Sequence, residues 1–389
     1  MTVLRCFRLQ DQLAVALVAL IFAPQIVCSQ EKTKVNANVL PFVEKGALAG
    51  AVMLAADRNK TLAVETAGYA DVAAKKPVQT NDLFWIASMS KPVTGTALMV
   101  LVDEGKVKLD DPVGNYLPEF SGVWLITEQD KDHQLLRRPA RPINVRDLLR
   151  HTSGMPFQSA METPTLDGLP LSVAVRSYAM TPLNYEPGTK YQYSNAGINT
   201  AARIIEVVTK QSFEDFLQTR FFDPLGMKDT TFWPNDEQVK RVVNAYGPTD
   251  DKMGLKEIKI GQLTYPLNDR RRGPMPAGGL FSTAADMGLF CQMILNKGEF
   301  KGKRYLSDAA VMEMAKKQTG DDIKDSYGLG WSVGDGWMGH GGALSTNMTV
   351  DFKRGLVTVW LVQHGGFPQD GGNAHGAFVN AANQLAEAK

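Results

Sequence analysis

Ile86-Ala87-Ser88-Met89-Ser90-Lys91-Pro92 is the stretch of this sequence that decides its fold and its chemistry. A serine hydroxyl is a poor nucleophile at neutral pH unless a base lies within hydrogen-bond reach. Residues three apart on a helix share a face, so Ser-x-x-Lys places an amine beside a hydroxyl. Apolar residues at helical spacing then predict a buried helix that begins near Ser88 and ends at Gly105. Pro92 fits only in the first turn, so Ser88 is expected at the helix N-terminus, where the dipole favours negative charge.

The same motif occurs a second time, as Ser29-Gln30-Glu31-Lys32, so the pattern alone does not identify a catalytic serine. This second copy lies at the end of what resembles a secretory signal. Arg5 and Arg8 precede an unbroken apolar run over residues 13–23, which is short for a bilayer span. We expect residues 1–29 to be a signal peptide and the protein to be exported to the periplasm or the medium. The alternatives are a retained N-terminal anchor and a lipid on Cys28, for which Val27 is a poor preceding residue.

Composition places the chain among ordinary globular proteins. Its 389 residues are 44% hydrophobic and 21% charged, a length that predicts about two domains. Without residues 1–29 the chain carries 40 basic and 40 acidic residues, so it has no net charge to attract nucleic acid or an anionic membrane. Cys291, the one cysteine outside that segment, lies in an apolar run and is expected to be buried. The five histidines show no metal-ligand spacing, so we expect no metal. The one match to the dinucleotide pattern G-x-G-x-x-G, residues 334–339, precedes a predicted strand rather than a helix, so we expect no other cofactor.

The order of sequence patterns predicts a divided α/β domain. Strand patterns over residues 50–55 and 61–68 are followed by helical stretches and Pro- and Gly-containing loops over residues 121–276. Strands are expected again at residues 328–333, 343–352 and 356–363, before an amphipathic helix over residues 376–386. We therefore predict an α/β domain formed by residues 33–120 and 277–389, with a mainly helical domain, residues 121–276, inserted into it.

Tyr193-Ser194-Asn195 is the second element of the candidate site, in a Gly- and Pro-flanked loop just before a predicted helix. A phenol can relay a proton between a serine, an amine and a leaving group, and a nearby ammonium favours its phenolate form. The Asn195 carboxamide can both donate and accept hydrogen bonds. The alternative is a turn tyrosine followed by a helix-capping asparagine.

Gly339-His340-Gly341-Gly342-Ala343 is the third element and is expected to open a strand. Glycines in a strand let a ligand lie against the backbone. The N–H groups of Ala343 and Ser88 can then form the two halves of an oxyanion hole. His364-Gly365-Gly366 is a competing motif, but His340 is favoured because it precedes a predicted two-stranded hairpin.

These three motifs, in this order, resemble the serine β-lactamase and penicillin-binding protein family, and most of all class C β-lactamase-like proteins and family VIII carboxylesterases. The resemblance spans about residues 35–388 and includes four connecting stretches: Asn144 to Gly154, Tyr185-Glu186-Pro187-Gly188, Pro224-Leu225-Gly226-Met227 and Gly278-Gly279-Leu280. It implies a β-lactamase/transpeptidase-like α/β fold, an antiparallel sheet flanked by helices.

The same resemblance implies the roles of the motif residues. Ser88 would be the acylated nucleophile, Lys91 and Tyr193 would share the general-base role, and Asn195 would orient Lys91 and the substrate. Gly342 and Ala343 belong to the substrate-binding strand, and His340 stands where β-lactamases carry a lysine. An exposed histidine with a pKa of about 6.5 is mostly neutral at pH 7 and anchors an anion less well than an ammonium does.

We therefore predict a serine hydrolase that forms an acyl-enzyme, and we favour a carboxylesterase for small esters. The alternatives are a β-lactamase or a D-alanyl-D-alanine carboxypeptidase, and a non-catalytic protein that binds cell-wall fragments. The expected partner is a small ester or amide substrate. We expect no nucleic acid and no stable membrane span after signal cleavage, and the sequence leaves the oligomeric state open.

Overall fold

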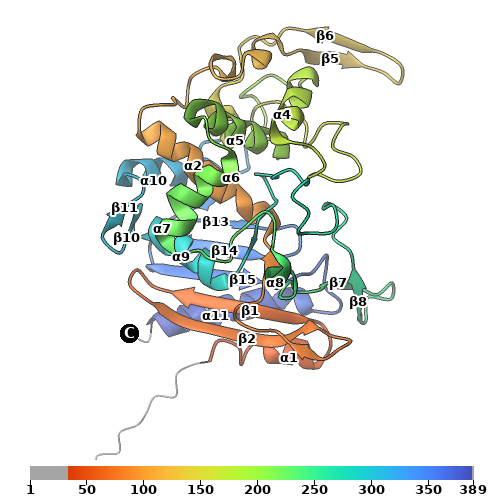
Figure 1. Cartoon of the computed structure of the whole chain (residues 1–389), viewed down its shortest axis with the longest axis vertical. Coiled ribbons are helices and arrows are strands. Elements are labelled where there is room, and N and C mark those ends of the chain that lie inside the picture. The colour runs from red at the N-terminus through yellow and green to blue at the C-terminus, as the bar shows by residue number, and fades with distance from the viewer. Residues whose placement is uncertain (1–33, 388–389) are drawn as a thin grey trace, which may run out of the picture. The chain divides into compact units, whose positions relative to one another are not determined.

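A seven-stranded antiparallel sheet forms the centre of the computed structural model, which describes residues 34–387. The predicted signal segment therefore lies outside the described residues. The strand order is β12-β13-β14-β15-β1-β2-β3, so strands from the two ends of the chain meet where β1 pairs with β15 (Figure 1). This confirms the predicted antiparallel sheet. Its strands are β1 (Gly50–Ala56), β2 (Thr61–Asp71), β3 (Lys76–Pro77), β12 (Ser332–Gly334), β13 (Trp337–Gly341), β14 (Asn347–Asp351) and β15 (Leu356–Leu361).

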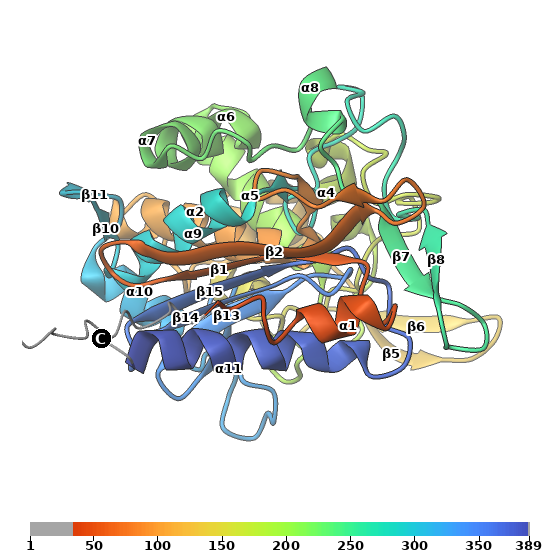
Figure 2. The same ribbon diagram turned by 90° about the horizontal axis from the view of Figure 1, so that it is seen from below.

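Helices cover both faces of this sheet, as Figure 2 shows. On one face, α11 (Ala374–Glu387) and α1 (Leu40–Glu44) pack against a cluster that includes Met53 and Trp360. On the other face, α9 (Ala284–Leu295) and α2 (Ser90–Asp103) belong to the cluster that contains Val52 and Leu54. Because β1 is buried on both faces, its sequence is a continuous apolar run rather than an alternating one.

The remaining elements surround these layers. The other α-helices are α3 (Val145–Leu149), α4 (Leu171–Met180), α5 (Asn195–Thr209), α6 (Phe213–Leu217), α7 (Asp223–Leu225), α8 (Asp236–Val239) and α10 (Asp308–Ala315). The short strand pairs are β4 (Phe84–Trp85) with β9 (Phe281–Ser282), β5 (Leu125–Gln129) with β6 (Gln134–Arg137), β7 (Ala245–Pro248) with β8 (Leu255–Ile258), and β10 (Glu299–Phe300) with β11 (Lys303–Arg304). The short 3₁₀ helices are η1 (Ala87–Met89), η2 (Val113–Asn115), η3 (Pro118–Gly122) and η5 (Gly371–Asn373), and η4 (Gln218–Phe222) is a π-helix.

Residues 121–276 contain helices α3 to α8, joined by long loops, and two hairpins, β5–β6 and β7–β8. Helix α2 packs against α5 across the predicted domain boundary, and the described residues cluster as one compact unit. The division into two domains stays a prediction.

The sequence led us to expect that the glycine motif around His340 opens a strand, but it does not. It closes one: His340 lies inside β13, and Ala343 lies in the turn between β13 and β14. Glycines have low strand propensity, so the run does not look like a strand. Here Gly339 allows a close approach instead, because a Cβ at this position would lie 2.4 Å from the Met348 carbonyl oxygen of β14.

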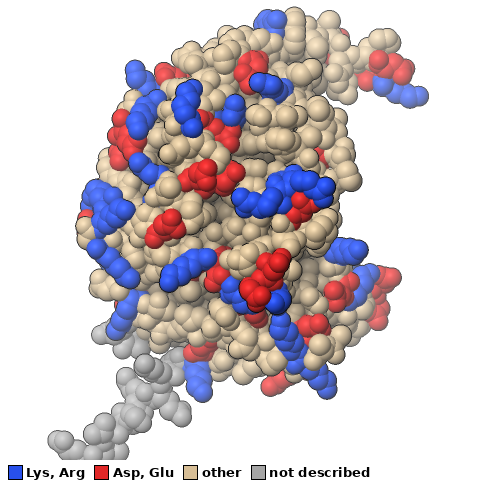
Figure 3. Space-filling view, in the orientation of Figure 1, with Lys and Arg blue, Asp and Glu red and all other residues tan. Residues whose placement is uncertain are grey.

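The surface and the buried cysteine agree with the composition. Basic and acidic side chains are interspersed over the face seen in Figure 3. Cys291 is fully buried in α9, as predicted. Among the described residues, no helix is both long enough and apolar enough to cross a bilayer.

Candidate active site

Ser88 lies in η1, immediately before α2, as the helix pattern predicted. Within residues 82–101 it alone is partly exposed, while the others are buried. Ala87, the preceding residue, has a φ of +46°, which is the left-handed region that a residue with a Cβ rarely adopts. Strain of this kind costs about 1–3 kcal/mol and is concentrated at functional sites. The backbone thus presents the Ser88 hydroxyl to solvent from an otherwise buried segment.

Lys91 is fully buried, and its Nζ lies 3.1 Å from Ser88 Oγ. The amine also donates hydrogen bonds to Asn195 Oδ1 at 2.7 Å and to the Ala277 carbonyl oxygen at 2.8 Å. Among the described residues, no carboxylate forms an ion pair with it. Burial lowers the pKa of Lys91 well below its usual range because desolvation disfavours the ammonium form.

Tyr193 and Asn195 reach Lys91 from the start of α5. The helix begins at Asn195, and the Ser194 hydroxyl caps it by accepting from Gly197 N–H. Lys91 Nζ lies 4.6 Å from the centre of the Tyr193 ring. Burial raises the pKa of Tyr193, although a hydrogen bond with Ser88 opposes the shift. The expected phenolate is therefore disfavoured, and Tyr193 is a neutral phenol at pH 7.

His340 reaches the same place from β13, and its ring centre lies 6.1 Å from that of Tyr193. We expected an exposed histidine with an ordinary pKa, which is wrong. The side chain is buried, its Nε2 lies 2.9 Å from the Tyr327 hydroxyl, and burial lowers its pKa to about 3, with Lys91 adding to the shift. His340 is thus neutral for a stronger reason than the one we gave. The competing His364 accepts the Ala49 N–H and stacks on Phe367.

The turn after β13 lies against the segment that carries Ser88. A Cβ at Gly342 would lie 2.5 Å from the Ile86 carbonyl oxygen and 3.3 Å from the Ala87 Cβ, so only glycine allows this contact. Gly342 N–H donates to the Thr346 carbonyl, which closes the turn. Within the described part of the chain, no carbonyl accepts the next N–H, that of Ala343. The other six predicted site residues therefore lie around Ser88.

His151 belongs to this group as well, although the sequence gave it no role beyond a family-like stretch. It is fully buried, and its ring centre lies 4.6 Å from those of Tyr193 and Tyr327. Its Nδ1 accepts the Ser194 N–H at 3.2 Å, which connects it to the tyrosine loop. No sequence pattern separates such a residue from an ordinary core histidine.

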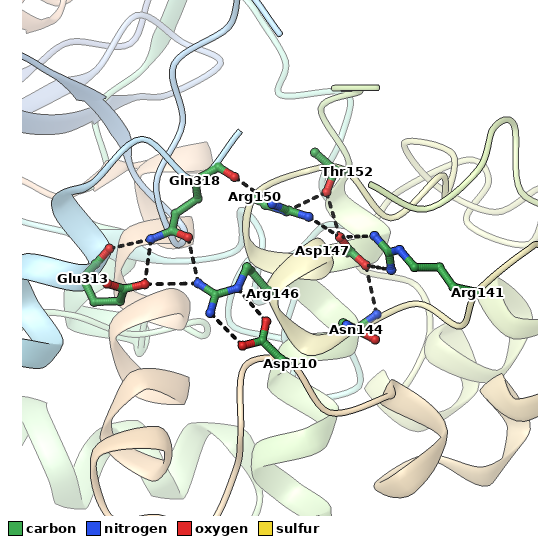
Figure 4. Close-up of polar contacts among 9 residues, drawn as sticks. All are labelled: Asp110, Arg141, Asn144, Arg146, Asp147, Arg150, Thr152, Glu313 and Gln318. Atoms are coloured by element: carbon green, nitrogen blue, oxygen red, sulfur yellow. Dashed lines mark hydrogen bonds and ion pairs between the residues drawn. The ribbon is translucent and has the colours of Figure 1, made fainter. Parts of the chain in front are cut away.

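An ion-pair network that includes the buried Asp147 surrounds the segment just before His151 (Figure 4). Asp147, 1% exposed, accepts from Arg141, Arg150 and Thr152. Burial alone would raise the pKa of Asp147, but these hydrogen bonds and the Asn144 N–H lower it overall. The network stabilises the turn in which His151 has a φ of +59°.

A cavity of about 480 Å³ lies between residues 161–169 and 263–265 and has no charged side chain in its lining. Its apolar wall consists of Met161, Pro164, Leu169, Leu263 and Tyr265. None of these lining residues is a predicted site residue. The chain just before the cavity approaches the site, because the Phe157 carbonyl accepts the Asn195 N–H and its ring lies 6.4 Å from that of Tyr193. Leu263 belongs to the same hydrophobic cluster as Ala87 and Leu344. A larger cavity of about 590 Å³, near the β1–β2 turn and the end of α9, likewise contains none of the predicted site residues. In the described residues no cluster of His, Cys, Asp or Glu fits a metal ion.

A serine next to a buried amine, a phenol and the Ala343 N–H, at the end of a strand of an antiparallel sheet, defines a serine-hydrolase type of site. The chain belongs to the Beta-lactamase family, a family of serine hydrolases, whose sequence profile matches residues 35–381.

Three known proteins show the range of this similarity. Protein Rv1367c of Mycobacterium tuberculosis is 32% identical over 325 residues, which cover 81% of this chain and 79% of that protein. Lovastatin esterase of Penicillium rubens is 28% identical over 374 residues, 82% of this chain and 90% of its own length. The solved structure of EstCE1, a hydrolase with promiscuous acyltransferase activity, superposes with a TM-score of 0.75 at 23% identity, and the match covers 90% of this chain and 97% of that one.

Proposed function

We propose that this protein is a carboxylesterase that hydrolyses small apolar esters through an acyl-enzyme on Ser88. The observation that carries the proposal is the environment of Lys91. A neutral amine has two N–H groups and one lone pair. Asn195 Oδ1 and the Ala277 carbonyl oxygen can only accept hydrogen bonds, so the two N–H groups of the amine point at them. The lone pair then faces Ser88 Oγ, which lies 3.1 Å away.

In the first step Ser88 Oγ attacks the ester carbonyl carbon while its proton passes to Lys91 Nζ. The negative charge develops on the carbonyl oxygen, where the N–H groups of Ser88 and Ala343 serve as donors. One such donor contributes about 10²–10³-fold in rate. The tetrahedral intermediate collapses, the ester C–O bond breaks, and the alcohol leaves with a proton relayed through Tyr193. As a neutral phenol beside both Ser88 and Lys91, Tyr193 suits this relay better than the role of first base.

Water completes the cycle. Lys91 returns to its neutral form when it gives up its proton through Tyr193, and the pair can then accept a proton from a water that attacks the acyl carbon. The C–O bond to Ser88 breaks and the serine recovers its proton. Asn195 holds Lys91 throughout, because its Oδ1 accepts from the amine at 2.7 Å.

Two features favour an apolar ester over a β-lactam or a peptide that ends in D-alanine. His340 is buried and neutral, so this position offers no cation to a substrate carboxylate. The cavity between residues 161–169 and 263–265 has no charged residue in its lining and has apolar side chains from both segments, which suits an aliphatic acyl group. Lovastatin esterase, which resembles this chain, is named as an esterase.

The experiment compares rates on p-nitrophenyl butyrate, nitrocefin and a peptide ending in D-Ala-D-Ala. We expect the ester to have the highest kcat/KM, Ser88→Ala to abolish its hydrolysis, and the neighbouring Ser90→Ala to retain it. A higher kcat/KM on nitrocefin or on the peptide would replace the esterase with the corresponding alternative. Hydrolysis that survives in Ser88→Ala would refute the assignment of the nucleophile.

Export is the second part of the proposal and rests on residues 1–29 alone. If these residues are a signal peptide, the mature protein secreted by a host that carries out such export begins near Gln30. The intact mass of the secreted protein tests this, and a full-length mass would support the anchor instead.

A further inference from the structure

A second asparagine of α5 is connected to Lys91 by hydrogen bonds. Asn199 lies four residues after Asn195, so both side chains are on one face of the helix. Asn195 accepts directly from Lys91, whereas Asn199 Oδ1 accepts the backbone N–H of Ala277 at 2.9 Å. Ala277 is the residue whose carbonyl oxygen accepts from Lys91 at 2.8 Å. One helix therefore positions both acceptors of the amine.

Behind Asn199 the hydrogen bonds continue to a buried carboxylate. Asn199 Nδ2 donates to the Tyr178 hydroxyl at 2.9 Å, and that hydroxyl donates to Glu162 Oε1 at 2.5 Å. Glu162 Oε2 accepts the Ser159 N–H at 2.8 Å. Asn199 and Glu162 are each 2% exposed and Tyr178 is fully buried. Both carboxylate oxygens of Glu162 accept hydrogen bonds, so the Tyr178 hydroxyl donates to Glu162 and accepts from Asn199 Nδ2. The orientation of the Asn199 amide is therefore fixed.

The Ala277 carbonyl needs such support because its segment has no regular structure. Residues 261–280 contain neither helix nor strand, and Gly278 and Gly279 follow directly. If this carbonyl moved away, the Lys91 amine would rotate to find another acceptor. The lone pair of the amine would then no longer point at Ser88 Oγ, although the amine would stay in the pocket.

We propose that Asn199 is a positioning residue for Lys91: supported by Tyr178 and Glu162, it fixes the Ala277 carbonyl and thereby aims the lone pair of the amine at Ser88. This inference rests on the proposed function of Lys91 as the base. It assigns a role to a buried polar chain that touches neither the substrate nor the reacting atoms.

The test compares Asn199→Leu with Thr200→Val by ester hydrolysis. Asn199→Leu keeps the side-chain size and removes both hydrogen bonds. Thr200→Val removes a buried hydrogen bond of the same helix, from Thr200 Oγ1 to the Ala196 carbonyl, that does not lead to Lys91. Because misplacing a catalytic group by about 1 Å can cost about 10²-fold, we expect kcat of Asn199→Leu to fall about ten- to hundred-fold. KM should change less than about two-fold, since no substrate contact is lost. Thr200→Val should behave as wild type.

Tyr178→Phe provides an intermediate case, because it leaves the Asn199–Ala277 hydrogen bond in place and removes only its support. We expect a smaller fall in kcat, again with KM unchanged. Thermal denaturation of each variant shows that it is folded at the assay temperature.

Equal kcat values for folded Asn199→Leu and wild type would overturn the inference, as would equal losses in Asn199→Leu and Thr200→Val. If Asn199→Leu does not fold, the kcat of Tyr178→Phe is compared with those of wild type and Thr200→Val instead, and an unchanged kcat would overturn the inference. A wild-type protein that is folded but hydrolyses no ester would instead refute the proposed function.

Discussion

The substitution Lys91→Arg tests whether Lys91 acts as a base or only as a positive charge. Arginine has a permanent positive charge and N–H donors for Asn195 Oδ1 and the Ala277 carbonyl, but it cannot be deprotonated in a protein. Lysine, fully buried and without an acidic partner in the described residues, has a pKa well below its usual range and can be neutral. The substitution therefore removes the lone pair that faces Ser88 Oγ at 3.1 Å.

Loss of a general base costs about 10²–10⁴-fold in rate, which is about 3–5 kcal/mol in the activation barrier. We expect Lys91→Arg to lose this much kcat/KM on p-nitrophenyl butyrate, and Lys91→Met, which removes both charge and base, to lose at least as much. Circular dichroism and thermal denaturation check that both variants fold. A folded Lys91→Arg within tenfold of wild type would show that Lys91 acts only through its charge, and the proposed base would be wrong.

Three further predictions concern pH, substrate choice and stability. The kcat/KM of the wild type should fall as the pH is lowered through the depressed pKa of Lys91, with a midpoint well below the ordinary lysine value of about 10.4, measured as a pH–rate profile. His340→Lys should raise the ratio of nitrocefin to ester hydrolysis about ten-fold, because a charge-assisted hydrogen bond to a substrate carboxylate contributes about 1.5 kcal/mol; an unchanged ratio would remove His340 from substrate selection. Asp147→Asn should lower the free energy of unfolding by about 3 kcal/mol at pH 7 in urea titrations. Since the folded pKa of Asp147 is lowered, that stability is present above the unfolded pKa of about 3.9 and is lost as the pH falls through the folded pKa, so a difference that persists at lower pH would contradict the ionic role.

Local patterns predicted much of this molecule because local physics decides those parts. The apolar period after Ser88 and the position of Pro92 placed the nucleophile at the start of a helix, where the structure has it. The apolar run of residues 50–55 indicated a strand, and the structure has β1 there. The three motifs then gathered at one site, since each lies at the end of an element or in the turn beside it.

The rest depends on contacts between distant segments. The burial of His340 comes from Tyr327 and the packing of β13, and neither the strand nor the depressed pKa can be read from a run of glycines. Nothing near Asn199 in the sequence indicates that its amide meets Ala277, 78 residues away. Tyr193 likewise owes its raised pKa to burial, which a Tyr-x-Asn motif does not encode.

The most direct test of the central claim is to trap the acyl group. We expect a fluorophosphonate probe to add one label to the wild-type protein, and peptide mapping to place it on Ser88. Ser88→Ala should take no label and Ser90→Ala should label as wild type. A folded wild-type protein that takes no label, or a label on any residue other than Ser88, would contradict the account.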